Sequence, residues 1–167
     1  MLKEEQVKEI LSRLHSANVR FLIIGGVAMR LLGSDRETVD IDLLYWRDPE
    51  NLRLLAEAMS PVRPTLRGAP PDLPFKLDER SLRHGLNFTL ESTCGDIDLL
   101  ADVGIKASFE ELWSRSVEMT VYDVPVRVAC LDDLIEMKRT AGRTKDQLQL
   151  LELETLKNLI EGQEGQK

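Results

Sequence analysis

One pentapeptide, Asp-Ile-Asp-Leu-Leu, occurs twice in the chain, at residues 40–44 and again at 96–100. Both copies lie in apolar runs typical of buried strands, where alternate side chains point to the same face. Each copy therefore places two carboxylates on one face, about 6.5–7 Å apart. Aspartate is disfavoured in strand interiors, and at an effective dielectric of 20 such a pair repels by about 2–3 kcal/mol. If the two strands are neighbours, the converging carboxylates need a cation.

Carboxylate oxygens select hard cations such as Mg²⁺, Mn²⁺ or Ca²⁺. The acids alternate along a strand, without the glycine and the distant glutamate of a calcium-binding loop, so that kind of site is excluded. Paired Mg²⁺ ions held by carboxylates serve phosphoryl and nucleotidyl transfer. A single Asp-x-Asp is also compatible with a solvated strand face, and the second copy argues against that interpretation.

The order of apolar and turn patterns predicts a mixed α/β fold, a sheet flanked by helices. We expect one domain over residues 1–167, with a core at 19–128 and a C-terminal helical segment at 131–161. Strands are expected at 19–26, 37–46, 85–92 and 95–103, with a hairpin that turns near Asp123. Helices are expected to begin at Asp48-Pro49 and at a Ser108/Glu111 capping box, and the last helical stretch is interrupted at Gly142. Residues 61–74 hold five of the seven prolines and predict an extended connection.

Composition excludes several classes of function. A formal charge of −7 disfavours sequence-independent binding to nucleic acid. No apolar run reaches the roughly 20 residues that span a bilayer, and residues 1–15 form an amphipathic helix pattern, so we expect a cytoplasmic protein without a membrane partner. Cys94 and Cys130 are expected to be reduced, and two histidines are too few for an imidazole or thiolate metal site.

Gly25 and Gly26 end the first predicted strand and precede a short helix. Free backbone N–H groups at this position favour an anion, and the missing side chains would let a triphosphate approach closely. The alternative is a tight turn with no ligand. The sequence has neither the Gly-Lys-Ser/Thr of a Walker loop nor the GxGxxG of a dinucleotide site.

The combined pattern, Ile-Ile-Gly-Gly followed after 13 residues by Asp40-Ile-Asp42, resembles the DNA polymerase β-type nucleotidyltransferase superfamily. The resemblance implies that fold, two Mg²⁺ or Mn²⁺ ions held by Asp40, Asp42 and a third carboxylate, and a nucleoside triphosphate as substrate. Alignment on Asp-Leu-Leu places the third carboxylate at Asp98, with Asp96 as the alternative. Gly25 and Gly26 would contact the triphosphate. Thr38, on the same strand face as Asp40, could hydrogen-bond a phosphate of the nucleotide or a carboxylate; an ordinary strand threonine is the alternative.

Residues 131–150 carry a basic cluster at Lys138, Arg143 and Lys145. A solvated helix face is one interpretation, with Lys138 and Lys145 seven residues apart on one face. The stretch also resembles the distal motif of minimal nucleotidyltransferases of bacterial abortive-infection and toxin–antitoxin systems, which implies that these residues neutralise the triphosphate. Gln149 departs from that motif, where an aspartate is usual.

The leading hypothesis is a Mg²⁺-dependent enzyme that transfers a nucleoside monophosphate, for example from ATP, to a hydroxyl of RNA, protein or a small molecule. Asp98 would assist deprotonation of that hydroxyl. A toxin–antitoxin role, with an antitoxin as partner, follows from the second resemblance. The alternatives are a non-catalytic nucleotide- or metal-binding regulator on the same fold and a partner-binding module. The basic segment with Arg63, Arg67, Lys76, Arg80 and Arg83 is expected to be a solvated loop or an acceptor surface.

Overall fold

The protein is built around one mixed sheet. The structure is a computed structural model that describes residues 1–142 and 144–165, without the side chains of residues 144–146. In these residues seven strands pair in the order β3-β4-β5-β2-β1-β7-β6. The strands are β1 (Phe21–Ile24), β2 (Asp40–Tyr45), β3 (Thr65–Leu66), β4 (Phe88–Ser92), β5 (Gly95–Leu100), β6 (Val117–Val121) and β7 (Val124–Val128). The predicted mixed α/β class is therefore confirmed.

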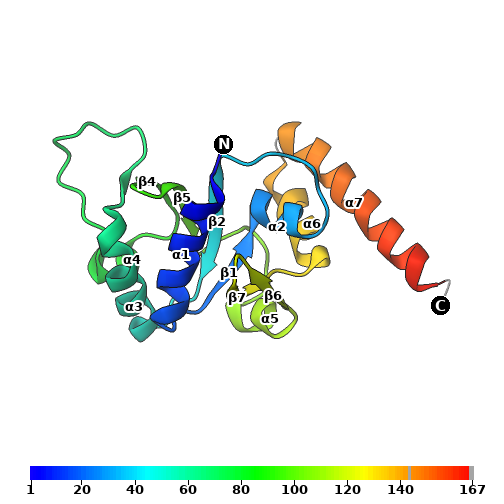
Figure 1. The fold of residues 1–167 in the computed structure, drawn as a ribbon, viewed down its shortest axis with the longest axis horizontal. Helices are drawn as coiled ribbons and strands as arrows, with labels where there is room; N and C mark the ends of the chain where they lie inside the picture. The colour runs from blue at the N-terminus through cyan, green and yellow to red at the C-terminus, as the bar shows by residue number, and fades with distance from the viewer. Residues whose placement is uncertain (143, 166–167) are drawn as a thin grey trace.

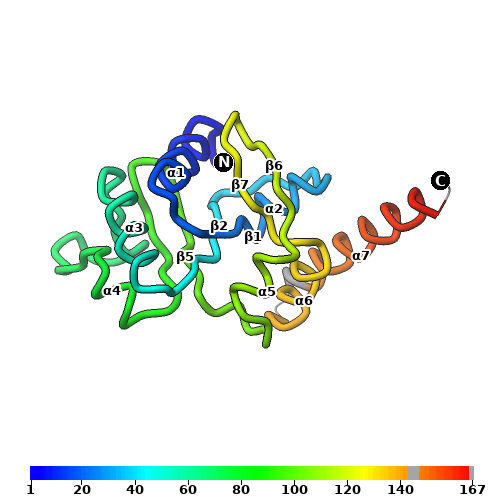
Figure 2. The backbone as a smooth tube through the Cα atoms, turned by 90° about the horizontal axis from the view of Figure 1, so that it is seen from below, coloured from blue at the N-terminus to red at the C-terminus, as the bar shows by residue number. Residues whose placement is uncertain are grey.

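Helices cover the sheet on both sides. In Figure 1, helices α1, α3 and α4 lie toward one end of the molecule, and α2, α6 and α7 lie toward the other, with α7 projecting from the body. The tube in Figure 2 shows the strands passing between these two groups. The helices are α1 (Glu4–Ser16), α2 (Gly25–Leu31), α3 (Pro49–Met59), α4 (Glu79–His84), α5 (Phe109–Ser114), α6 (Leu131–Ala141) and α7 (Thr144–Glu164).

Strand β2 is central to the site. It pairs antiparallel with β1 and parallel with β5. Every residue of β1 is buried, and in β2 the side chains of Ile41 and Leu43 are fully buried on the face opposite the aspartates. Each buried aliphatic side chain of this size contributes about 1.5–3 kcal/mol. The apolar face thus fixes β2 firmly enough to hold costly carboxylates on the other face.

Local signals set several helix boundaries as the sequence predicts. Asp48 caps α3 by accepting hydrogen bonds from the N–H groups of Glu50 and Asn51. Ser108 and Glu111 form the capping box of α5. Gly142 ends α6 in the left-handed conformation at φ 65°, which glycine adopts without a steric penalty. The chain interruption expected there is confirmed.

The proline-rich region contains more structure than the sequence predicts. A 3₁₀ turn (Ser60–Val62), the two-residue strand β3 and helix α4 lie between residues 60 and 84. Strand β3 exists because Thr65 and Leu66 pair with β4, a partner about 25 residues away along the chain, which local patterns do not reveal. Helix α4 begins at Asp78, whose capping partner is Ser81 rather than the glutamate or glutamine of the usual motif.

All four strands predicted with bounds are shorter in the structure, and the first two differ next to the site. The first ends at Ile24 because Gly25, at φ 63°, already begins α2. The second begins only at Asp40. Cys94 and Cys130 are both free thiols, as expected. No helix among the described residues has the length and apolar character to cross a membrane.

Candidate active site

The two copies of the pentapeptide are paired in register. Strands β2 and β5 run parallel, with Asp40 opposite Asp96 and Asp42 opposite Asp98. Asp40, Asp42 and Asp98 each offer a carboxylate oxygen, and these three oxygens lie within 4.8 Å of one another. The predicted convergence of the two strands is confirmed. Three carboxylates on neighbouring rigid strands are a suitable ligand set for a hard divalent cation.

Asp42 lies deepest in this cluster. The pKa of Asp42 is raised to about 7, first by burial and then by the negative charges of Asp40 and Asp98. The charge of Lys138 and a hydrogen bond from the Gly26 N–H act in the opposite direction. Burial also raises the pKa of Asp98. Two carboxyl groups that resist ionisation at one place indicate a cluster short of positive charge.

The two glycines form the floor beneath Asp42. A Cβ at Gly25 would overlap the Asp42 carboxylate, and a Cβ at Gly26 would come within 2.8 Å of Thr38 Oγ1. Gly25 also has a φ of 63°, which disfavours any side chain. In this structure the glycines therefore let Asp42 and Thr38 lie directly against the backbone. Their contact with a triphosphate stays a prediction.

Thr38 is buried immediately before β2. Its hydroxyl donates a 2.8 Å hydrogen bond to the Asp40 carbonyl and lies 3.5 Å from Asp40 Oδ1. The hydroxyl therefore orients the start of the first copy. Binding of phosphate by Thr38 stays a prediction.

The predicted basic cluster of Lys138, Arg143 and Lys145 does not lie on a single helix, because α6 ends before residues 143 and 145. Lys138 lies on α6 and is close enough to Asp42 to lower its pKa. Arg143 lies outside the described residues, as does the side chain of Lys145. The prediction that Lys138 and Lys145 share one helical face is wrong, because α6 ends at Ala141 and residue 145 belongs to α7.

Two cavities meet at Asp42, Met29 and Lys138. The polar one, about 300 Å³, is lined by the three aspartates together with Gly26, Arg36, Glu37, Thr38, Val39 and Gln149. The Oε1 atom of Gln149 is buried and has no hydrogen-bond partner among the described residues. The second cavity, about 400 Å³, has mainly apolar walls that include Leu100, Val103, Leu134, Met137 and Leu153. Both sizes fall at the low end of typical ligand pockets.

Sequence reasoning missed two sets of contacts. Arg67, expected in a solvated basic segment, instead turns inward to the carboxylates: its Nη2 donates to Asp98 Oδ1 at 2.8 Å. Glu152 of α7 accepts hydrogen bonds from Ser34 and from Arg36, the latter at 2.6 Å. Both depend on residues distant in sequence. The available signal was an isolated cluster of arginines in an acidic chain.

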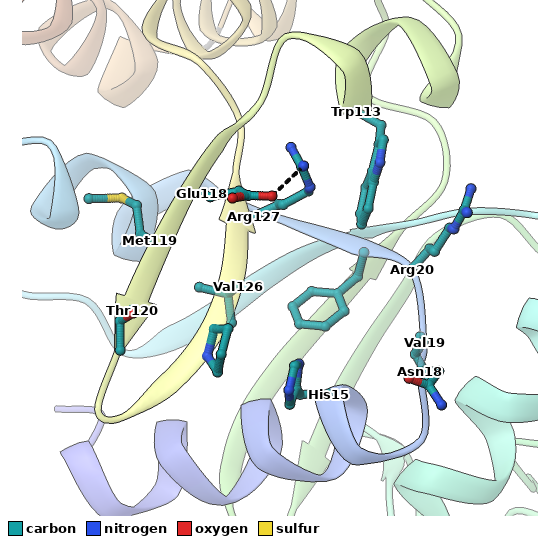
Figure 3. A pocket seen from close by; sticks show the side chains of 12 residues that line it. His15, Asn18, Val19, Arg20, Trp113, Glu118, Met119, Thr120, Val126 and Arg127 are labelled. Atoms are coloured by element: carbon teal, nitrogen blue, oxygen red, sulfur yellow. Dashed lines mark hydrogen bonds and ion pairs between the residues drawn. The ribbon is translucent and has the colours of Figure 1, made fainter.

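A larger cavity, about 750 Å³, lies beside the other end of β1. Figure 3 shows Trp113 between the guanidinium groups of Arg20 and Arg127, with Arg127 paired to Glu118 at 2.6 Å. The guanidinium carbons lie 5.6 and 4.9 Å from the Trp113 ring centroid. These cations are engaged in stacking and pairing, and the three clustered aspartates do not line this cavity. The candidate site is therefore the carboxylate cluster.

Comparison with solved structures supports the fold. The lincosamide antibiotic adenylyltransferase LnuA with bound lincomycin superposes with a TM-score of 0.61 at 13% identity, covering 93% of this chain and 98% of that one. The complex of ANT(2'')-Ia with adenylyl-2''-tobramycin gives a TM-score of 0.55 at 17% identity, covering 96% and 97%. A nucleotidyltransferase-like protein from Paracoccidioides brasiliensis gives 0.53 at 16%, covering 93% and 75%.

No protein-family model matches the sequence, and no curated protein matches it. At these low identities the solved structures establish the fold alone. The chain has the polymerase β-like nucleotidyltransferase fold that the glycine and aspartate pattern implies.

Proposed function

We propose that this protein is a divalent-metal-dependent nucleotidyltransferase, which moves a nucleoside monophosphate from a nucleoside triphosphate to an acceptor hydroxyl and releases pyrophosphate. The observation that carries the proposal is the convergence of Asp40, Asp42 and Asp98 beside Lys138. The sequence pattern and the shared fold both support it.

The three carboxylates fit a hard cation by donor type and by spacing. The raised pKa values of Asp42 and Asp98 point to the same need for positive charge. A bound Mg²⁺ or Mn²⁺ would supply charge neutralisation at the phosphates and Lewis-acid activation. Asp40, Asp42 and Asp98 would hold it.

The polar cavity is suited to the triphosphate. Lys138 borders it and supplies a compact positive charge for phosphate oxygens. Asp98 borders the same cavity, and we propose that its carboxylate assists deprotonation of the attacking hydroxyl. The unpartnered Oε1 of Gln149 offers an acceptor for a hydroxyl of the bound substrate.

The apolar cavity is suited to the nucleoside. It adjoins the polar cavity at Asp42 and Lys138, so a base held by its apolar walls would leave the phosphates at the carboxylates. Met29 and Met137 supply adaptable apolar contacts for a planar ring. The residues that line this apolar cavity would determine which nucleotide base binds.

For the acceptor we propose a small molecule that bears a hydroxyl. Two structures with this fold hold small antibiotics, lincomycin in LnuA and an adenylylated tobramycin in ANT(2'')-Ia. Each superposition covers at least 93% of this chain and at least 97% of the other. RNA and protein acceptors, and a toxin–antitoxin role, stay predictions from the sequence.

The test is transfer of label. Purified protein is incubated with each α-labelled nucleoside triphosphate, Mg²⁺ or Mn²⁺, and a cell extract separated into small-molecule, RNA and protein fractions. We expect metal-dependent labelling of the small-molecule fraction with release of pyrophosphate, and none with Asp40→Asn. Arg53→Gln, on the exposed face of α3, is the matched control.

Two results would argue against the proposal. Labelling by Asp40→Asn at the wild-type rate would remove the carboxylates from the mechanism. Binding of metal and nucleotide without any release of pyrophosphate would instead support a non-catalytic regulator on the same fold.

A further inference from the structure

Arg67 lies over one face of the sheet, and both its backbone N–H and its guanidinium are hydrogen-bonded to β4. It directly follows the edge strand β3, and its backbone N–H donates to the Thr89 carbonyl at 3.0 Å. At the other end Nη2 donates to the Leu90 carbonyl at 2.8 Å. The side chain is 26% exposed. These contacts carry the guanidinium from the sheet edge across β4 to the carboxylates of β5.

The guanidinium contacts the two copies of the pentapeptide unequally. It lies 2.8 Å from Asp98 Oδ1, 3.2 Å from Asp96 Oδ2 and 3.8 Å from Asp40 Oδ2. Only the Asp98 contact has hydrogen-bond geometry; Nε, near Asp96, is buried without a hydrogen-bond partner among the described residues, so that attraction is one of charge. Arg67 therefore belongs mainly to the second copy.

Asp96 differs from the other three aspartates. Among the described residues it offers no oxygen to the cluster of Asp40, Asp42 and Asp98. Its side chain is 39% exposed, against 26% for Asp40 and 21% for Asp98. It is the second residue of β5, opposite Asp40 of β2 on one side and Glu91 of β4 on the other.

We propose that Arg67 and Asp96 form a charge-compensating pair that tunes the metal site without binding the metal. Arg67 neutralises Asp96 and occupies one oxygen of Asp98, which leaves Oδ2 of Asp98 for the cation. Arg67 is thus a positioning residue for Asp98, and Asp96 is the anchor of Arg67. The pair limits the site to three ligands, because the positive charge of Arg67 offsets the negative charge that Asp96 would otherwise add beside the metal. This inference rests on the metal site of the proposed function.

The alternative is that Asp96 is a fourth ligand. Single variants do not separate the two cases, because Asp96→Asn lowers the negative charge near the metal in both. The double variant Arg67→Gln/Asp96→Asn does separate them, because it removes one positive and one negative charge together. If the two residues form a compensating pair, the affinity for metal stays nearly unchanged. If Asp96 is a ligand, the double variant binds metal more weakly.

The experiment measures Mn²⁺ binding by electron paramagnetic resonance in the absence of nucleotide. We expect Arg67→Gln to bind Mn²⁺ at least about threefold more tightly than wild type, since a nearby positive charge is gone. Asp96→Asn should bind more weakly, and the double variant should return to within about threefold of wild type. Arg67→Lys should stay close to wild type, and Arg53→Gln is the control for loss of a surface arginine.

Either of two results would overturn the pairing. One is a double variant whose Mn²⁺ affinity is more than about threefold lower than that of wild type; the other is an Arg67→Gln variant that binds Mn²⁺ more weakly than wild type. Circular dichroism checks folding, and Arg67→Met/Asp96→Leu replaces the double variant if that fails to fold. If wild type itself binds no Mn²⁺, the proposed function fails; if wild type binds and only the double variant is lost, the pairing alone fails.

Discussion

The same five residues stand side by side on β2 and β5, yet the two copies have different surroundings. In the first, Asp42 lies on the backbone of Gly25 and Gly26, and its positive neighbour is Lys138. In the second, Asp98 and Asp96 face the guanidinium of Arg67. Asp42 of the first copy lies deepest and its raised pKa indicates a shortage of positive charge, whereas the second copy has the Arg67 guanidinium as its counter-charge.

This difference shows that one short sequence can serve two roles when its two copies have different neighbours. The pentapeptide determines that each copy places two carboxylates on one face of a strand. The tertiary neighbours determine how strongly each carboxylate needs an external cation. We therefore assign two metal ligands to the first copy and one to the second.

The largest expected effect separates the two copies by activity. Asp42→Asn should lower nucleotidyl transfer by about 10³-fold, because loss of a metal ligand removes several kcal/mol of transition-state stabilisation. Asp96→Asn should reduce transfer only at low metal concentration and recover at saturating Mn²⁺. Rates measured across a Mn²⁺ titration check both. Equal losses of transfer rate in the two variants, neither restored by saturating Mn²⁺, would show that the two copies do not differ in role.

The next effect is on how the unfolding free energy of the metal-free protein depends on pH. The pKa of Asp42 is about 7 in the folded state, against roughly 3.9 for an unfolded aspartate. Between these values the folded state binds more protons, so this group's contribution to the unfolding free energy falls as pH rises from about 4 to 7. The slope is at most about 1.4 kcal/mol per pH unit. Urea unfolding in a chelator should show a weaker decline in Asp42→Asn; parallel curves would contradict this.

A third effect compares two glycines of positive φ, Gly25 at the start of α2 and Gly95 at the start of β5. Gly25→Ala combines a φ of 63° with overlap on the Asp42 carboxylate, and should cost about 3 kcal/mol and impair metal binding. Gly95→Ala, at φ 92°, meets only the ends of the Leu2 and Gln6 side chains and should cost about 1 kcal/mol. Unfolding midpoints and Mn²⁺ affinity of both variants give the measurement. If Gly25→Ala bound Mn²⁺ like wild type, the close fit of Asp42 to the backbone would be irrelevant.

The smallest effect concerns the chain just beyond the second copy. Val103 lines the apolar cavity three residues after Leu100. Val103→Trp should fill that cavity and raise KM for the nucleotide by about tenfold while Mn²⁺ binding stays unchanged. Leu148→Trp, at a position 60% exposed on α7, is the control. An unchanged KM would place the nucleoside elsewhere.

The sequence predicted those parts of the site that depend on local pattern. Strand alternation placed Asp40 and Asp42 on one face, and the caps at Asp48 and Ser108 set helix starts. The third carboxylate at Asp98 came from the resemblance to the polymerase β-type superfamily, aligned on Asp-Leu-Leu, and the register of β2 with β5 places Asp98 beside Asp42. Short-range rules suffice where one strand or one turn determines the outcome.

The remainder depends on contacts between distant segments. Arg67 reaches Asp98 only because β3 pairs with β4, and nothing in a proline-rich stretch signals that pairing. Glu152 likewise meets Arg36 across 116 positions. Such contacts are set by packing, and packing is not visible in residue order.

Mn²⁺ binding to wild type and to Asp42→Asn, measured without nucleotide and at one pH, tests the central claim most directly. The assignment predicts saturable binding to wild type and an affinity at least about tenfold lower in the variant, because a deep ligand of the first copy is lost. Equal binding by the two proteins, or no saturable binding by wild type, would contradict it.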